Sequence, residues 1–424
     1  MTPGSRAGTR AVVFAETAQR ITRVHAPGQP PGETATVRRG MCVETHSGPG
    51  ELRHVFADGT SLLDSAVTRL SPEAARAARA ALAVAPPGVP KSAEEALRRG
   101  ADDGTRLTWA RSWQRVAVGS PDQLRTDTRS LCSVEASVLG GDGGALASAA
   151  VPWDAARPRS SAERLAETVA ALRRRAALPV GELPGRACPV VLDAGQAGAF
   201  FHELVGHPLE ADIVLARSSY LARRRGEMVA PPWFGVVDGA GTAVGAIGGQ
   251  WDDEGSRVRP SRMIDAGRVG EPLSDIASAA LLGGRSSGHG RRLDYRHCVL
   301  PRMRHTVAAA QAASATPVLP DGLRLHPRGL QLRWMNLLTG DFEFAVTDAL
   351  LVADDAPVCR TGPLRLAGNG LRVLAGLRPG GGQPIACGAR ATRGCGKLDQ
   401  FPLPVSFANS TLWLPAEVLR VDAV

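Results

Sequence analysis

Lysine and aromatic side chains are scarce in this sequence of 424 residues. Lys91 and Lys397 are the only lysines, so arginine supplies nearly all of the positive charge behind the formal net charge of +9 at pH 7. Aromatic residues make up only 4%, although stacked aromatic rings are a usual component of surfaces that bind single-stranded nucleic acids. No nucleic-acid recognition motif accompanies the arginines, and basicity alone is weak evidence for such binding. We therefore do not expect a nucleic-acid partner.

Long apolar runs and paired cysteines are missing as well. No window approaches the ~18 uncharged apolar residues of a membrane-spanning helix, and residues 1–20 contain no continuous apolar segment typical of an export signal. The seven cysteines are an odd number and show no CxxC spacing. This usage is typical of a reduced chain and not of a disulfide framework. The sequence predicts a cytoplasmic protein that does not associate with a membrane.

The chain is long enough for two domains, and its first part contains signals for both strands and helices. Hydrophobic residues make up 44% of the sequence, enough for two cores. Alternating segments at 11–25 and 38–61 predict strands. Ser71 as N-cap, with Pro72 at the first helical position, predicts a helix over 71–85. A short helix is expected over 91–104 and an amphipathic one over 161–176.

The composition changes near residue 180 to short β-branched runs rich in glycine and proline, with few helix signals. We place a domain boundary near 178–186. The expected fold class is α+β: an N-terminal α/β-type domain of strands and helices over 1–180, followed by a mainly antiparallel β domain over 181–424. The second domain carries the helix described next.

The segment FHELVGHPLEAD, residues 201–212, is similar to the HExxH motif of zinc peptidases but has one more residue between its histidines. His207 lies five positions after His202, about 140° away around an ideal α-helix, and Gly206 occupies the usual ligand position. A π-type widening, or a helix that ends at Gly206, would bring both imidazoles to one metal ion. The alternative is that one histidine is an ordinary core or surface residue, because short motifs often match by chance.

Cys395 is the best candidate for a third ligand. Gly394 and Gly396 flank it, so we expect its thiol to be sterically open, and a nearby cation or metal would favour the thiolate. A lone cysteine is more often a small buried apolar residue. We assign the other six cysteines to that class.

Five motifs occur in an order that points to a known family. HELVGHPLEAD at 202–212 is followed by WDDEG at 251–255, SSGHGRRLDYRHCVLPRM at 286–303, TGDFEFAVTDALLV from 339 and GCGKLDQ at 394–400. In these motifs the chain resembles the TldD/PmbA family, also called the modulator of DNA gyrase family. The likeness covers residues 180–424 and, more faintly, the N-terminal part. Pro208, Leu398 and Asp399 depart from the family pattern, which affects the expected substrate preference more than metal binding.

The resemblance implies a zinc ion held by His202, His207 and Cys395, with Glu203 as the catalytic carboxylate. It implies a TldD-like catalytic subunit that forms a heterodimer with a related TldE/PmbA-like subunit lacking HExxxH. Family members of this type resemble metallopeptidases or amide hydrolases. Their substrates, as the resemblance implies, include unfolded peptides, modified peptides and natural-product intermediates, so peptide or natural-product maturation is an expected role.

Such a ligand set predicts a hydrolytic mechanism. Two imidazoles and a thiolate leave one tetrahedral position for water, as in a catalytic zinc site. Zinc lowers the pKa of that water toward about 7, and Glu203 can take its proton and return it to the leaving amine. The expected reaction is attack of this water on the scissile carbonyl of a peptide or other amide, in a substrate that can reach a buried site.

Two charged runs have open roles. Arg291 and Arg292 could hold a substrate carboxylate, or could form a solvated face, which is the commoner role. The acidic run at 252–254 could bind a hard cation, but acidic residues at a turn usually cap their own backbone, so we assign no metal to it.

Two other functions stay open besides hydrolysis. One is a non-catalytic subunit or binding module of a heterodimer, against which the intact His202, Glu203, His207 and Cys395 argue. The other is a nucleic-acid-associated regulator, which rests on the basic composition and on the family's historical name.

Overall fold

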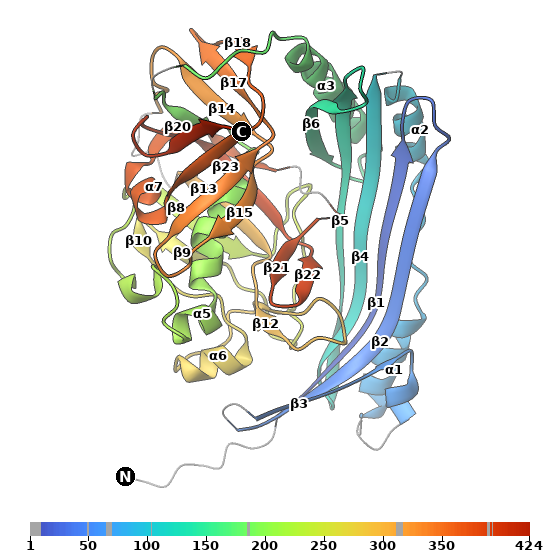
Figure 1. Cartoon of the computed structure of the whole chain (residues 1–424). Coiled ribbons are helices and arrows are strands. Elements are labelled where there is room, and N and C mark those ends of the chain that lie inside the picture. Colours follow the sequence, from blue (N-terminus) through green and yellow to red (C-terminus); the bar gives the residue numbers. More distant parts are fainter. Residues whose placement is uncertain are drawn as a thin grey trace.

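The N-terminal part and the rest of the chain form two bodies that lie side by side (Figure 1). The computed structural model describes residues 10–48, 51–64, 70–102, 104–184, 187–310, 317–387, 391 and 393–424. A sheet of long strands is one body, and a larger body of shorter strands and short helices is the other. No helix within the described ranges is both long enough and apolar enough to cross a membrane.

In the described part of the chain, six strands form the N-terminal sheet, in the order β3-β2-β1-β4-β5-β6. These are β1 (Arg10–His25), β2 (Gly32–Gly48), β3 (Glu51–Asp58), β4 (Thr105–Ser120), β5 (Gln123–Leu139) and β6 (Ala145–Pro152). Every neighbouring pair is antiparallel. The segment expected at 11–25 forms a single strand, and the segment expected at 38–61 contributes to the β2–β3 pair.

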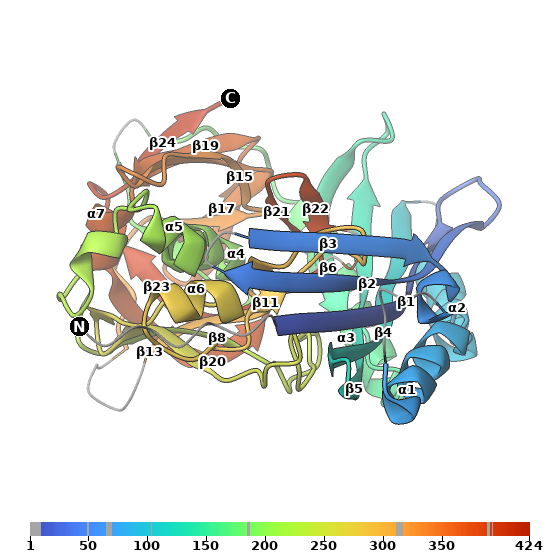
Figure 2. The same cartoon turned by 90° about the horizontal axis from the view of Figure 1, so that it is seen from below.

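The three expected helices are confirmed: α1 (Pro72–Ala83), α2 (Lys91–Gly100) and α3 (Pro158–Ala176). The Ser71 side chain caps α1 by accepting a hydrogen bond from the Ala74 N–H at 3.1 Å. The third helix begins at Pro158, earlier than the expected residue 161, because proline suits the first turn of a helix. In Figures 1 and 2, α1 and α2 lie on the side of the sheet that faces away from the C-terminal body.

Successive residues of the N-terminal sheet point to opposite faces, as the pleat of a strand requires. Val13 and Ala15 pack on one face, in a cluster with Ala78 of α1. Phe14 points to the other face, in a cluster with Tyr295 of the C-terminal body. Both faces of the sheet are therefore covered, one by helices and the other by the second body.

A ten-stranded mixed sheet organises the described part of the C-terminal body, in the order β10-β9-β8-β13-β23-β7-β14-β17-β18, with β20 also paired to β23. The pairs β13–β23 and β7–β14 are parallel, and the other pairs are antiparallel. Its strands are β7 (Val190–Leu192), β8 (Phe234–Gly239), β9 (Ser261–Asp265), β10 (Arg268–Val269), β13 (His305–Ala310), β14 (Arg324–Arg328), β17 (Asp348–Ala353), β18 (Ala356–Arg360), β20 (Arg378–Ala386) and β23 (Ser406–Leu414).

Smaller antiparallel sheets complete this body. One contains β15 (Gln331–Met335), β16 (Asp341–Val346), β19 (Leu364–Asn369) and β24 (Arg420–Ala423), and two hairpin-like pairs join β11 (Gly290–Arg291) to β12 (Leu300–Pro301) and β21 (Cys395–Lys397) to β22 (Gln400–Leu403). The short helices are α4 (Gly198–Phe201), α5 (Ala211–Leu215), α6 (Ile276–Leu281) and α7 (Gly370–Gly376). The expected α+β class with a strand-rich C-terminal part is confirmed.

The boundary expected near 178–186 falls between α3 and β7. Residues 185 and 186 lie outside the described part of the chain. Val180 already forms a bridge to Arg360 of β18, so the connecting segment contacts the C-terminal sheet as soon as α3 ends. We propose the division into residues 1–180 and 181–424 as two domains.

Candidate metal centre

A π-helical turn brings His202 and His207 together. It follows α4 directly, spans His202–Gly206 and is closed by a hydrogen bond from the His207 N–H to the His202 carbonyl. This bond spans five residues where an α-helix spans four, so the wider turn accommodates the extra residue of HExxxH. The ring centroids of the two histidines lie 5.2 Å apart. Of the two expected routes, the π-type widening is the one that the chain adopts.

A glycine is needed at position 206 for close packing and not for an unusual backbone angle. Its φ of −64° is ordinary for a helix. A Cβ atom built on this glycine would lie 1.8 Å from the Sδ atom of Met303, far closer than any real contact. Glycine therefore lets the segment before β13 pack against the turn that carries the histidines.

Cys395, on β21, lies beside the two histidines although it is 188 residues away from His207. Its Sγ atom is 3.1 Å from His207 Nε2, and the ligand atoms of His202, His207 and Cys395 all lie within 4.8 Å of one another. In Figure 1 the β21–β22 pair lies between the mixed sheet and the N-terminal sheet. The structure thus brings the three expected ligands to one point.

The expectation of an open thiol is wrong, because Cys395 is buried. A Cβ atom at Gly394 would lie 2.2 Å from the carbonyl oxygen of Leu403. The flanking glycine therefore permits close approach of β22 and does not expose the sulfur. The opening of the site lies instead on the side of His207 and Glu203, whose side chains are 14% and 20% exposed.

The charges at this site suit a metal ion. Although burial opposes ionisation, the imidazoles of His207 and His202 hold the pKa of the Cys395 thiol well below its ordinary value. Burial lowers the pKa of His207, but Cys395 and Glu210 outweigh that effect and raise it. A thiolate beside a protonated imidazole is the arrangement in which a metal ion can displace a proton.

Hydrogen bonds orient both imidazoles from behind. His207 Nδ1 lies 3.0 Å from Glu210 Oε2, and His202 Nδ1 lies 3.3 Å from Thr306 Oγ1. The Thr306 hydroxyl donates to Asp238 at 2.6 Å, so its oxygen accepts from His202. Both rings thus carry the proton on Nδ1 and present Nε2 to Cys395, the arrangement typical of metal-ligating histidines.

The Nε2 atom of His202 is a second indication that these side chains suit a metal ion. It is buried and makes no hydrogen bond of normal geometry to any residue that the structure describes. A buried nitrogen without a partner costs free energy, and a metal ion at the point shared with Cys395 would remove that cost. The donor set of two imidazoles and a thiolate is one that zinc binds.

Glu210 is the carboxylate that supports His207, a role that was not predicted from the sequence. Burial favours its neutral form, yet His207 and Lys397 together hold its pKa at about 2. The Lys397 ammonium lies 3.0 Å away, and the Arg302 Nε atom lies 3.8 Å away. Its place three residues after the second histidine is the sequence signal that could have identified it.

Glu203 differs from Glu210 in its access to solvent. Its Oε2 atom lies 3.6 Å from His207 Nε2, and its side chain is 20% exposed, whereas the Glu210 side chain is 1% exposed. Burial raises the pKa of Glu203. Of the two carboxylates at His207, only Glu203 can reach a water molecule or substrate that enters from the opening.

Arg291 and Arg292 are both buried, so the solvated-face alternative is wrong. Arg291 donates to the carbonyl oxygens of Met303 at 2.6 Å and Pro404 at 2.8 Å. Arg292 forms an ion pair with Glu44 of β2 at 2.9 Å. The Arg292 pair joins the C-terminal body to the N-terminal sheet, whereas the Arg291 contacts lie within the C-terminal body.

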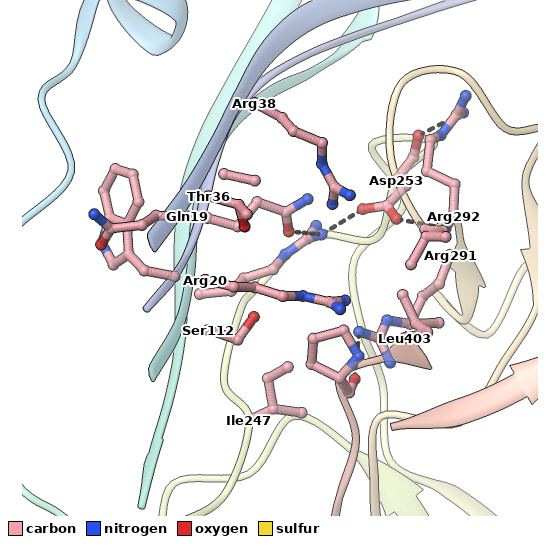
Figure 3. Close-up of a pocket in the computed structure, with 16 residues that line it drawn as sticks. Gln19, Arg20, Thr36, Arg38, Ser112, Ile247, Asp253, Arg291, Arg292 and Leu403 are labelled. Atoms are coloured by element: carbon pink, nitrogen blue, oxygen red, sulfur yellow. Dashed lines mark hydrogen bonds and ion pairs between the residues drawn. The ribbon is translucent and has the colours of Figure 1, made fainter. Parts of the chain in front are cut away.

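The two arginines also line a cavity of about 40 Å³ between the two bodies (Figure 3). Arg20 and Arg38 reach into it from the N-terminal sheet, opposite Asp253 and the two arginines. A cavity of this size holds a few water molecules. A substrate role for Arg291 and Arg292 stays a hypothesis.

The acidic run at 252–254 makes structural contacts. Asp252 Oδ1 accepts hydrogen bonds from the backbone N–H groups of Glu254 at 3.0 Å and Ser256 at 2.8 Å. Asp253 pairs with Arg129 of β5, and all three acidic residues are buried. Asp252 therefore caps its own turn, as acidic residues in turns usually do.

Comparisons with known proteins find similarity to metallopeptidases. Residues 184–387 match the model of the PmbA/TldA metallopeptidase C-terminal domain, a range that includes the two histidines and ends before Cys395. A metalloprotease TldD homolog from Haemophilus influenzae is 31% identical over 196 residues, which cover 45% of this chain and 40% of that protein. A zinc metalloprotease TldD homolog from Saccharolobus solfataricus is 27% identical over 192 residues, or 44% and 42% of the two chains.

These matches span about two fifths of the length of the curated relatives. The similarity of the fold extends further. The crystal structure of TldE from Thermococcus kodakarensis superposes with a TM-score of 0.68, covering 97% of this chain and 96% of that chain at 13% identity. At that identity the likeness concerns the fold alone.

Proposed function

Because this chain belongs to the TldD/PmbA family, we propose that it is a zinc-dependent hydrolase of peptide or other amide bonds. The observation that carries the proposal is the convergence of His202, His207 and Cys395 within 4.8 Å, with Glu203 on the open side. The names of the curated relatives, metalloprotease and zinc metalloprotease, support the same reaction class.

The three side chains would hold zinc through two Nε2 atoms and a thiolate. When bound, zinc supplies a Lewis acid that lowers the pKa of a water molecule and polarises a carbonyl group. Glu210 and Thr306 keep both imidazoles directed toward the ion, as supporting contacts do at other metal sites. Because Cys395 is buried, bulk water does not reach the site from the side of the thiolate.

Glu203 would act as the general base and then as the general acid. It takes a proton from the attacking water and returns it to the amine that leaves. Its carboxylate is adjacent in sequence to His202 and 3.6 Å from His207 Nε2, so it lies within reach of a substrate carbonyl that approaches the two histidines.

The substrate class follows from access. His202 is only 1% exposed and the His207 side chain 14%, so an unfolded peptide, a modified peptide or a peptide-like metabolite suits the buried site better than a folded protein. We further propose a heterodimer with a TldE/PmbA-like subunit, which the similarity to the TldE fold supports.

None of the seven cysteines forms a disulfide bond, which supports a cytoplasmic location.

The test is hydrolysis of unstructured peptides, followed by mass spectrometry, for the chain alone and with a TldE-like subunit. Glu203→Gln should lower kcat by about 10²–10⁴-fold and should keep its zinc. Glu163→Gln, on the exposed face of α3, is the matched control and should keep full activity. Full activity in Glu203→Gln would remove Glu203 from the mechanism. An unchanged zinc affinity in Cys395→Ala would remove the third ligand.

A further inference from the structure

A second group of metal-ligating side chains lies away from the candidate centre. Glu44 of β2, His54 of β3 and Cys298, just before β12, offer ligand atoms that lie within 4.8 Å of one another. We propose that these three residues form a second divalent-metal site, with zinc as the ion that a mixed set of oxygen, nitrogen and sulfur donors favours. This site is independent of the hydrolytic function proposed above.

The hydrogen bonds of His54 leave its Nδ1 atom a place for a proton or a metal ion. Its Nε2 atom lies 3.1 Å from the carbonyl oxygen of Tyr295, which can only accept, so Nε2 carries a proton. Its Nδ1 atom lies 3.1 Å from Glu44 Oε1. Two lone pairs repel at that distance, so either a second proton or a metal ion must sit on Nδ1. A carbonyl behind the other ring nitrogen is the contact that orients histidines at metal sites.

Glu44 is held so that one oxygen stays on the side of His54. Its side chain is 1% exposed. Arg292 binds the Oε2 atom at 2.9 Å, and the Val299 N–H donates to Oε1 at 3.2 Å. The guanidinium therefore balances the charge of one oxygen, while Oε1 faces the imidazole. Ligating carboxylates are usually hydrogen-bonded in this manner.

Cys298 supplies the donor that selects zinc over a hard cation. Burial and the nearby Glu44 raise the pKa of its thiol, against the opposing effect of Arg292. The thiol is therefore protonated without a metal, and binding must release its proton. The side chain is half-buried, which leaves room for a water molecule as fourth ligand of a tetrahedral ion.

The position of the site indicates what it would do. Glu44 and His54 belong to the N-terminal sheet, whereas Cys298 belongs to the C-terminal body. Tyr295, which contacts His54, packs in the cluster that joins the two bodies. An ion at this point would tie β2 and β3 to the segment before β12 and stabilise the contact between the bodies.

The first test uses a chain in which the candidate centre is removed by His202→Ala, His207→Ala and Cys395→Ala. Cobalt titration of this triple variant should show one equivalent bound per chain, with the thiolate-to-cobalt charge-transfer absorption. Adding Cys298→Ser should abolish the absorption, whereas adding Cys359→Ser, another half-buried cysteine, should leave it unchanged. No cobalt absorption in the triple variant, or its survival after Cys298→Ser, would overturn the proposal.

A second measurement decides the question if the triple variant does not fold. In the otherwise unchanged chain, Cys298→Ser should lower the zinc content by one ion per chain. Zinc content equal to that of the unchanged chain would refute the second site. Since neither readout involves hydrolysis, the outcome is distinct from that of the Glu203→Gln experiment.

Discussion

The N-terminal sheet and the candidate metal centre are built in opposite ways. In the sheet, strands of up to 17 residues pair mostly with their neighbours in sequence. At the metal centre, short elements from residues 202–207, 306 and 395 meet at one point. The sheet depends on local pairing, whereas the centre depends on contacts between distant segments. The residues that join the two bodies should therefore control stability, and those behind the histidines should control metal affinity.

The largest expected effect comes from breaking a buried ion pair between the two bodies. Arg129 of β5 pairs with Asp253 and donates to the Trp251 carbonyl at 2.7 Å. Arg129→Met leaves the Asp253 carboxylate buried without its partner, which should cost about 3–5 kcal/mol of unfolding free energy. Urea denaturation measures the loss.

A matched control for that experiment is Arg159→Met, which removes an ion pair from a 93% exposed side chain. It should change stability by less than about 1 kcal/mol. Equal effects of the two substitutions would mean that the contact between the bodies does not depend on the buried pair.

The next effect is a pH dependence that originates in the N-terminal sheet. Burial raises the pKa of Glu16 from 4.5 to about 7, with Asp294 adding to the rise and Gln114 and Arg38 opposing it. Between these pH values the folded state binds more protons than the unfolded state, so stability falls as pH rises. The raised pKa contributes about 3 kcal/mol to the free energy of unfolding at low pH. This contribution is fully lost only above pH 7.

Glu16→Gln should remove this contribution. Its free energy of unfolding should then decline less than that of the unchanged chain between pH 5 and 8, as measured by urea denaturation at several pH values. Glu163→Gln, on the exposed face of α3, should keep the original slope. A slope that persists in Glu16→Gln would assign it to another group, of which Asp252, with a pKa also raised by burial to about 7, is the first to test.

A smaller effect is expected behind the histidines. Glu210→Gln weakens the contact that orients His207, and such changes lower metal affinity by about 10–100-fold. Competition with a chelator, in a Cys298→Ser background, measures the candidate centre alone. Glu227→Gln, on an exposed residue, is the control. Unchanged affinity in Glu210→Gln would show that His207 needs no support.

The smallest effect concerns the π-helical turn. Gly206→Ala places a methyl group against Met303, and overpacking of this kind costs about 1–3 kcal/mol. Alanine is otherwise the better helix former. A double variant with Met303→Ala should recover part of the loss, and a thermodynamic cycle measures the coupling. Additive losses would mean that Gly206 acts through something other than this contact.

Local signals in the sequence predicted local structure well. Ser71 and Pro72 were sufficient to locate the start of α1, because a cap and a proline act within one turn. For the same reason, the spacing of the histidines in HExxxH predicted either a widened turn or a helix that ends at Gly206, and the chain adopts the first. The short helices α5, α6 and α7 were not expected, since they contain too few residues for a periodic pattern to be recognised.

Features that depend on distant contacts could not be predicted in the same way. Cys395 was assigned through the family resemblance and its flanking glycines, and its burial by β22 was not foreseen. For Arg291 and Arg292 the sequence left two roles open, a contact with a substrate carboxylate or a solvated face, and charged residues usually face solvent. Their partners, Pro404 and Glu44, lie more than a hundred residues away, so no local pattern indicates that these arginines are buried.

The separation of 188 residues between His207 and Cys395 also sets the time between their synthesis on the ribosome. At about 5–20 residues per second, translation of that interval takes on the order of 10–40 s. During this time the N-terminal sheet, whose last strand ends at Pro152, can already fold. The two histidines have then been synthesised, but Cys395 has not. Under the proposed ligand set, the metal site would be completed only after the whole segment from His207 to Cys395 has been synthesised.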